Sequence, residues 1–160
     1  MKIHFKLLVF LAIGSLFATS CQSDDKQPQS IVALAERVQS GLSEHFIFEL
    51  TESPTEQFEI RSKGKKIVVR GSTLNSITAG FGWYLKYYCN SGTFWNVERN
   101  PIPVPLPKVD GKIVHQTSMK HRYYFNYCCD RYSFRYWDWA RWQQEIDWMA
   151  LNGVNIAQLF

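Results

Sequence analysis

The stretch from Arg122 to Phe134, "RYYFNYCCDRYSF", gathers the side chains of this sequence with the most capacity for ligand recognition. It holds an amide at Asn126, adjacent thiols at Cys128 and Cys129, and several tyrosines, among them Tyr132. An amide exchanges hydrogen bonds with hydroxyl groups, and a tyrosine ring offers a flat apolar face with a polar tip. Such a set could line a sugar pocket, form a metal or disulfide site, or fill a core.

The spacing of the cysteines and histidines argues against metal and disulfide chemistry. Beyond Cys21 the chain has Cys89, Cys128 and Cys129, an odd number without Cys-x-x-Cys spacing. This pattern fits neither a disulfide framework nor a structural zinc site. Adjacent cysteines rarely bond to each other, so we interpret this pair as reduced, inert thiols. The histidines share no ligand spacing and no glycine-rich phosphate loop is present, so we expect no metal and no cofactor.

The acids and tryptophans that follow have structural interpretations. Most of these tryptophans share helical spacing with apolar residues, which is more typical of a core than of a sugar platform. Trp137 lies just before that helix, so it is the tryptophan most expected in the loop after the first strand. Asp138 is better placed as a helix N-cap than as a catalytic acid. Glu145 and Asp147 fall in mid-helix, and Arg141 with Glu145 is expected to form at most a weak surface pair.

A strand, a helix and a second strand must position these residues. "HRYYFNYC" has a strand pattern, a helix capped by Asp138 runs through Leu151, and "VNIAQLF" is an apolar strand. The pattern predicts a βαβ unit with parallel strands. Asn126 and Cys128 lie two apart, so they are expected on the same side of the first strand. A barrel of eight such units needs about 250 residues, so we expect this chain to be the front of a longer protein.

The upstream part predicts a separate small module. Residues 31–99 combine a helix from Ile31, a strand "FIFEL", a hairpin around Lys63-Gly64 and a helix from about Thr73 to Cys89. Ser30 and Ser72 are the expected N-caps of the two helices. Residues 100–111 hold four prolines and predict a stiff, extended connector. The barrel part is expected to occupy residues 112–160.

The N-terminus has the pattern of an exported protein. Lys2 and Lys6 precede an apolar run that is too short to span a bilayer and ends at "ATSC". We interpret residues 1–20 as a signal peptide and Cys21 as the lipidated cysteine of a bacterial lipoprotein. Residues 21–30 would be a tether, and the acidic pair in "QSDDK" resembles a signal for surface export. An ordinary signal peptide with a nearby cysteine and a bland polar tether is the alternative.

The charge of the chain gives no sign of a nucleic-acid partner. Without residues 1–20, which hold two lysines and no acids, 16 Lys and Arg face 14 Asp and Glu. The net charge therefore falls from +4 to +2. With no basic cluster, a phosphate backbone is not an expected partner.

One long motif resembles a known enzyme family. "YSF…WDWARW…EIDWMALNG" resembles the start of the barrel in the α-N-acetylglucosaminidases, family eighty-nine of the glycoside hydrolases. "IVVRGSTLNSITAGFGWYLKYYC" is similar to the N-terminal module of the same family. The resemblance implies a small α+β module followed by a (β/α)₈ TIM barrel, of which this chain holds the first βαβ unit, and an α-helical C-terminal domain. The implied activity is the removal of terminal α-linked N-acetylglucosamine with retention of configuration.

The resemblance also implies a set of pocket residues. The family lines its sugar pocket with an Asn, a Cys and a Tyr that correspond here to Asn126, Cys128 and Tyr132. Its two catalytic glutamates come from later barrel strands, so we expect no catalytic residue in this chain and no turnover by it alone. In the structural alternative, Asn126 satisfies buried backbone groups and Tyr132 packs against a loop.

Two further readings of the function stay open. The chain could be a lipid-anchored, non-catalytic glycan-binding remnant at the cell surface. It could also be a truncated pseudogene product. In the preferred interpretation the chain has two partners. One is a glycan with terminal N-acetylglucosamine, and the other is the outer membrane, to which the lipidated Cys21 anchors the protein.

Overall fold

The computed structural model describes residues 27–92, 99–124, 128, 132 and 134–158. Cys21 and the expected signal peptide lie outside these residues, as does most of the tether. The described elements, in chain order, are α1 (Gln29–Val38), the 3-10 helix η1 (Leu42–His45), β1 (Phe46–Leu50), β2 (Glu56–Lys63), β3 (Lys66–Gly71), α2 (Leu74–Tyr87), β4 (Lys112–Thr117), β5 (Tyr123–Tyr124), the 3-10 helix η3 (Phe134–Tyr136), α3 (Trp139–Leu151) and β6 (Ile156–Ala157).

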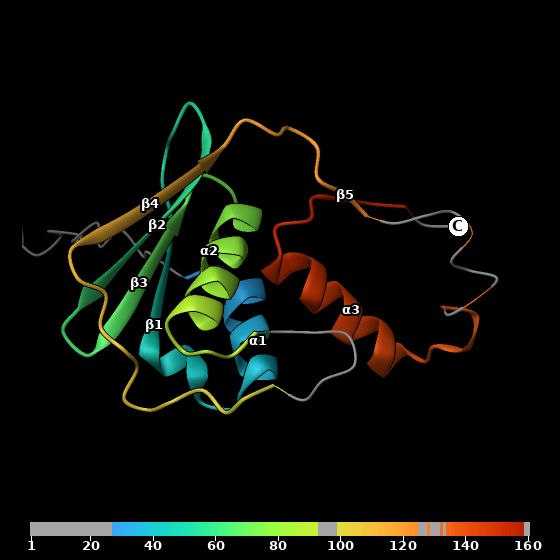
Figure 1. The fold of residues 1–160 in the computed structure, drawn as a ribbon, viewed down its shortest axis with the longest axis horizontal. Helices are drawn as coiled ribbons and strands as arrows, with labels where there is room; N and C mark the ends of the chain where they lie inside the picture. Colours follow the sequence, from blue (N-terminus) through green and yellow to red (C-terminus); the bar gives the residue numbers. More distant parts are fainter. Residues whose placement is uncertain (1–26, 93–98, 125–127, 129–131, 133, 159–160) are drawn as a thin grey trace, which may run out of the picture.

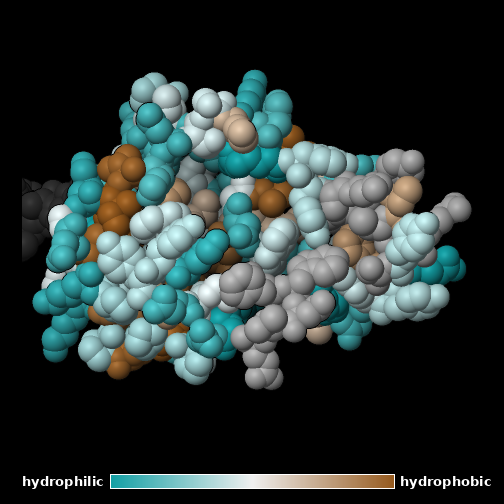
Figure 2. All heavy atoms as spheres, viewed as in Figure 1, coloured by the Kyte–Doolittle hydropathy of each residue, from teal (hydrophilic) through white to brown (hydrophobic). Residues whose placement is uncertain are grey.

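The N-terminal module is a four-stranded sheet with two helices on one face (Figure 1). The strand order is β1-β3-β2-β4, with β1 and β3 parallel and the other pairs antiparallel. In β1 the alternate residues Phe46 and Phe48 are buried, as the period of two predicts, whereas the central strand β3 buries Ile67–Val69 in succession. The core is aromatic at its centre, where the Phe46 ring lies 4.9 Å from the ring of Phe81 on α2. Figure 2 shows that polar residues cover most of the viewed face, with apolar residues only in small groups.

The proline-rich segment is part of this module rather than a free connector. Ile102, Leu106 and Val109 are buried in the module's core. The hydroxyl of Tyr84 on α2 donates a 2.6 Å hydrogen bond to the carbonyl of Pro107. Proline cannot join a helix or a central strand, but the residues between the prolines can still pack apolar side chains against the core, as Ile102 and Leu106 do while Val104 stays exposed.

The boundary between the two parts also differs from the expected one. The sequence-based division ended the module at residue 99 and began the barrel part at residue 112. The structure instead pairs β4 with β2 in the module's sheet, with Ile113 opposite Ile60 and His115 opposite Phe58. The proline-rich segment leads back to the sheet, so the module extends through Thr117.

The helix starts were predicted correctly in one case of three. Asp138 accepts a 2.8 Å hydrogen bond from the backbone N–H of Arg141, which confirms it as the N-cap of α3. The cap of α2 is Thr73, not Ser72, because the Ser72 hydroxyl is held by the backbone of β2. Pro28 occupies the N-cap position of α1, so the prediction of Ser30 was wrong.

The second part of the chain is a parallel βαβ unit, as predicted. Tyr123 pairs with Ile156 and Tyr124 with Ala157, and α3 lies between the two strands in sequence. In Figure 1, α3 lies on the side of α1 and α2 that faces away from the sheet. The order of layers is therefore the module's sheet, its helices, and then the βαβ unit.

The helices α2 and α3 approach each other at Gly82. A Cβ atom at this position would lie 2.9 Å from the carbonyl carbon of Leu151 and closer still to its oxygen. This contact confirms that a glycine within α2 serves close backbone packing. It also brings the C-terminal end of α3 directly onto the module.

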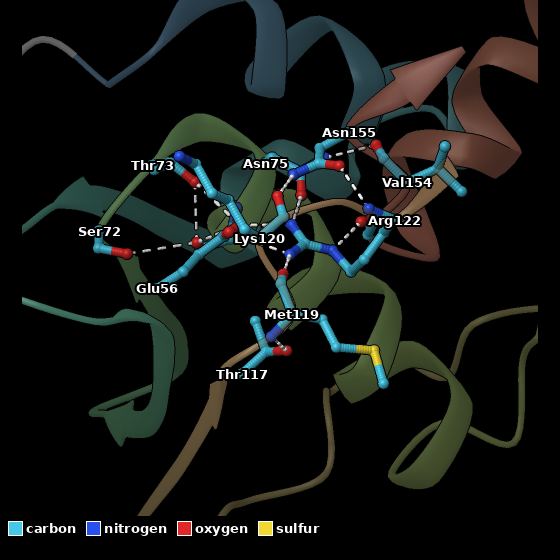
Figure 3. Close-up of polar contacts among 12 residues, drawn as sticks. Glu56, Ser72, Thr73, Asn75, Thr117, Met119, Lys120, Arg122, Val154 and Asn155 are labelled. Carbon is cyan, nitrogen blue, oxygen red and sulfur yellow. Dashed lines mark hydrogen bonds and ion pairs between the residues drawn. The ribbon is translucent and has the colours of Figure 1, made fainter. Parts of the chain in front are cut away.

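Arg122, the residue before β5, uses all five of its side-chain N–H groups, and three of them reach the module (Figure 3). Its terminal nitrogens donate to both carboxylate oxygens of Glu56 on β2, at 3.0 and 2.6 Å. Further bonds go to the Asn75 side chain on α2 (2.8 Å) and to the carbonyls of Met119 (2.8 Å) and Gly153 (2.5 Å). We call these residues the Arg122 clamp.

The turn between α3 and β6 is tied to the same clamp. The Asn75 amide donates to the carbonyl of Val154 at 2.7 Å. The Asn155 side chain accepts from the backbone N–H of Arg122 and donates to the carbonyl of Lys120, at 2.8 and 3.0 Å (Figure 3). Both strands of the βαβ unit are thereby held at their starts against β2 and α2.

In a second contact between the two parts, the arginine belongs to the module and the carboxylate belongs to α3. Arg37, in the last turn of α1, donates to both carboxylate oxygens of Asp147 on α3, at 2.8 and 2.7 Å. This hydrogen bond raises the pKa of the Arg37 guanidinium. The module thus supplies the carboxylate at one contact and the arginine at the other.

Replacement of Gly82 by alanine tests the contact between α2 and α3. In an exposed helix this change stabilises by up to about 1 kcal/mol, but here the added methyl group must displace the backbone of Leu151. We expect the free energy of unfolding to fall by about 1–3 kcal/mol, measured by urea denaturation. Lys86→Ala, at an exposed position of the same helix, is the control. A gain in stability for Gly82→Ala would show that the helices do not meet as described.

The pH dependence of stability tests the Arg122 clamp. The hydrogen bond from Arg122 holds the pKa of Glu56 below its usual value of 4.5. Glu56 therefore contributes stability that is fully present above that value and is lost as the pH falls through the lower pKa of the folded state. Wild type should exceed Glu56→Gln in melting temperature at neutral pH, and the gap should narrow in acid. Glu52→Gln controls for the loss of an exposed carboxylate, and a gap that is independent of pH would contradict the assignment.

Candidate functional site

The residues expected to line the sugar pocket lie at the end of β5 and in the segment that follows. Asn126 and Cys129 are outside the described residues. Cys128 is half-buried, and Tyr132 is 73% exposed. In the described residues β5 ends at Tyr124, so strand alternation cannot be followed as far as Cys128. The pocket formed by Asn126, Cys128 and Tyr132 stays a prediction.

Glu145 is the most deeply buried charged side chain beside this segment. Its side chain is 0% exposed, and one carboxylate oxygen accepts a 2.7 Å hydrogen bond from the hydroxyl of Tyr124 on β5. The other oxygen accepts a 3.0 Å bond from Arg141, one helical turn earlier. The prediction of a weak surface pair was therefore wrong, because this side of α3 packs against β5 instead of facing solvent.

Aromatic rings surround this carboxylate. The Arg141 guanidinium lies 3.9 Å from the centre of the Trp137 ring. That ring is 4.1 Å from the ring of Phe134 and 5.1 Å from the ring of Trp142. Phe134 and Met149 form the buried part of one hydrophobic cluster, and Trp137, Trp142 and Trp148 are partly buried against it. The interpretation as core is confirmed for the helical residues Trp142 and Trp148.

Trp139 is not part of this core, although its helical spacing predicted that it would be. It is 68% exposed, and Ile146 two turns later is 45% exposed. Ile146 also borders an open hollow of about 330 Å³ that is lined mainly by Met149, Val154 and Ile156. The hollow lies beside β6 and contains none of the expected pocket residues.

Cys89 is not a reactive thiol, and the described residues hold no metal-ligand cluster. Burial raises the pKa of the Cys89 thiol to about 11, so this cysteine is a protonated core residue. Within the part of the chain that the structure describes, no three His, Cys, Asp or Glu residues come together as a metal site. In the same part, no helix is both long and apolar enough to cross a membrane.

Two family patterns match this chain. The pattern for the "Alpha-N-acetylglucosaminidase (NAGLU) N-terminal domain" matches residues 29–108, and the one for the "Alpha-N-acetylglucosaminidase (NAGLU) tim-barrel domain" matches residues 122–160. The first covers α1 through most of the proline-rich segment. The second begins at Arg122, the residue that clamps the two parts together.

Individual relatives agree with these matches. Human alpha-N-acetylglucosaminidase is 47% identical over 92 residues, which are 58% of this chain and 12% of the human protein. The family 89 glycoside hydrolase from Clostridium perfringens, solved with 2-acetamido-1,2-dideoxynojirmycin, superimposes with a TM-score of 0.78 at 31% identity. That superposition covers 82% of this chain and 16% of the clostridial one.

A second clostridial structure carries a substrate. The Clostridium perfringens enzyme with two glutamates changed to glutamine, solved with GlcNAc-alpha-1,4-galactose, superimposes with a TM-score of 0.76 at 32% identity. It covers 81% of this chain, which spans 15% of that protein. The present chain thus corresponds to less than a fifth of each of these relatives.

The fold and the comparisons agree on the architecture. The sheet, α1 and α2 form the mixed α+β N-terminal module, and β5, α3 and β6 form the start of a TIM-barrel domain. This confirms the fold class expected from the sequence. The chain belongs to the α-N-acetylglucosaminidase family, family 89 of the glycoside hydrolases.

Proposed function

We propose that this chain is the N-terminal part of an exo-acting, retaining glycoside hydrolase that releases terminal α-linked N-acetylglucosamine from glycans. The observation that carries the proposal is the match of 81% of the chain, at 32% identity, to an enzyme solved with GlcNAc-alpha-1,4-galactose. The two family patterns match the module at residues 29–108 and the barrel part at residues 122–160.

The chain's own contribution would be recognition of the sugar rather than bond cleavage. Retention requires two carboxyl groups about 5–5.5 Å apart, one acting as nucleophile and one as acid and base. The acids of α3 have other partners: Glu145 binds Tyr124 and Asp147 binds Arg37. Asp138 is engaged as the cap of α3. As the family resemblance implies, the two catalytic carboxylates would come from later barrel strands, and these 160 residues alone would not turn over substrate.

Asn126, Cys128 and Tyr132 would line the sugar pocket. In the sequence all three lie between β5 and η3, at or just after the expected end of the first barrel strand. The carboxyl ends of barrel strands, with the loops that follow them, form the active-site face of TIM barrels. An asparagine amide can bond sugar hydroxyls, and a tyrosine ring can cover an apolar sugar face.

The N-terminal pattern supports export as a lipoprotein. Lys2 and Lys6, the apolar run and the small residues before Cys21 form a signal peptide with a modifiable cysteine. Cleavage would leave an acylated Cys21 joined to the module by a short polar tether. The enzyme would then sit on the outer membrane of a bacterium, facing either the periplasm or the cell exterior.

Kinetics of Asn126→Ala test the function and the pocket together. The full reading frame that encodes this chain should release N-acetylglucosamine from GlcNAc-α-1,4-galactose. Loss of a pocket hydrogen bond should lower kcat/KM by about tenfold, with the folded yield unchanged. Asn152→Ala, an exposed amide at the end of α3, is the control. Absence of release by wild type would contradict the function, and loss of folding in Asn126→Ala would favour the structural alternative.

Metabolic labelling tests the lipid anchor. Bacteria that express the chain and are fed an alkyne-tagged fatty acid should incorporate the tag into wild type but not into Cys21→Ser. The wild-type protein should fractionate with membranes and the variant should not mature. Equal labelling of both would show that Cys21 is not the acylated residue.

A further inference from the structure

We infer that one end of the module's sheet is a membrane-contact surface, which binds the anionic headgroups of the bilayer that would hold the acylated Cys21. The surface consists of the exposed lysines where β2 turns into β3 and where β4 begins. We call it the lysine end: Lys63, Lys65, Lys66, Lys108 and Lys112. The inference rests on the lipid anchor in the proposed function and says how the anchored module lies on the membrane.

The sheet topology brings these lysines together from two parts of the sequence. Lys63, the last residue of β2, pairs with Lys66, the first residue of β3. Lys112, the first residue of β4, pairs with β2 two residues before Lys63. Lys108 is held nearby, because the N–H of the residue after it donates a 2.8 Å hydrogen bond to the Ser62 hydroxyl. These strand ends lie at one end of the sheet (Figure 1), which is why the sequence alone showed no basic cluster.

The lysine end is free to bind a partner. All five lysines are exposed, and among the described residues Lys112 alone of the five forms an ion pair, with Glu59 at 3.5 Å. None of the large apolar side chains that the described residues expose lies in residues 61–66. A protein interface has an apolar core within a polar rim, so this end suits a diffuse electrostatic contact better than the docking of a protein.

The lysine end also holds the net positive charge of the chain. Arg61 on β2 adds a sixth basic side chain. The acids at this end are Glu44 before β1, Glu59 on β2 and Asp110 before β4. Six basic and three acidic side chains give a net charge of +3. Residues 21–160 as a whole carry +2, from 16 Lys and Arg against 14 Asp and Glu, so the remainder carries −1. Such an asymmetry turns the positive end toward an anionic surface.

The tether brings the bilayer within reach of the lysine end. The side-chain oxygen of Gln27, the first described residue, accepts a 2.8 Å hydrogen bond from the N–H of Phe48 on β1. Phe48 pairs with Val69, which lies three residues, or about 10 Å, beyond Lys66 on β3. Cys21 lies six residues before Gln27, a stretch that spans at most about 20 Å. An acylated Cys21 therefore keeps the lysine end close to the membrane surface.

The lysines would add orientation to the anchor. An acyl chain at the end of a short tether limits the distance of the module from the bilayer but does not fix its rotation. The attraction of lysines to anionic headgroups falls off within a Debye length, about 8 Å at physiological ionic strength, so it acts only when this end faces the bilayer. Compact ammonium groups on flexible stems suit headgroups whose positions vary.

Vesicle binding by the unlipidated enzyme tests the lysine end. The full reading frame is expressed from residue 21 with Cys21→Ser, and binding is measured by cosedimentation with vesicles of phosphatidylcholine that contain about one third phosphatidylglycerol. We expect binding that weakens in high salt and is absent with phosphatidylcholine alone. Lys63→Gln with Lys65→Gln should lower the affinity at least about fivefold.

Two further double variants control for total charge and for the turn. Lys86→Gln with Lys120→Gln removes the same charge from exposed positions outside the lysine end, so it should change the affinity less than about twofold. Lys108→Gln with Lys112→Gln should match the loss of the turn variant, because it removes charge from the same end through another segment. An equal loss in the Lys86 and Lys120 variant would show that only net charge matters and would overturn the inference.

The remaining outcomes separate the surface from the anchor. Equal binding to neutral vesicles, or no binding to anionic ones, would overturn the inference, and tighter binding to duplex DNA would assign the lysine end to nucleic acid instead. Vesicle binding without fatty-acid labelling at Cys21 would support the membrane contact and overturn only the anchor. Labelling at Cys21 without vesicle binding would overturn the lysine end and leave the anchor.

Discussion

The arrangement of this chain depends on one guanidinium group. Arg122 stands between the last strand of the module and the first strand of the barrel, and its side chain is only 20% exposed. Exposed ion pairs contribute little to stability, but this one is bidentate and shares its donors with an amide and two carbonyls. Because a planar guanidinium fixes the direction of all five bonds, the clamp sets orientation as well as distance. Lysine, with three donors on one nitrogen, could not replace it.

The clamp ties the start of the βαβ unit to the module. Arg122 holds the start of β5 on β2 and α2. Gly82 lets the C-terminal end of α3 lie against α2, and Arg37 holds the middle of α3 from α1. On α3, Asp147 faces the module and Glu145 faces β5. The module therefore positions β5 both directly, through Arg122, and indirectly, through α3.

Local patterns in the sequence predicted the elements well, and contacts between distant residues poorly. Hydrophobic periodicity placed the hairpin, both long helices and the βαβ unit, and Asp138 was identified from the residue types around it. Glu145 was placed on the surface because its neighbours in sequence do not reveal Tyr124, 21 residues earlier, as its partner. β4 was assigned to the barrel for the same reason: its pairing with β2 spans the proline-rich segment. The pocket residues came from a family resemblance, since an asparagine and a tyrosine carry no periodic signal.

Side-chain hydrogen bonds add to what the β5–β6 pair supplies itself. Isolated two-stranded pairs are marginal in water, so such a pair gains from neighbours that fix its register. The Asn155 side chain accepts a hydrogen bond from the Arg122 N–H, and Glu145 accepts one from the Tyr124 hydroxyl. Because one bond lies just before β5 and the other at Tyr124, α3 and the turn after it hold this strand at two points.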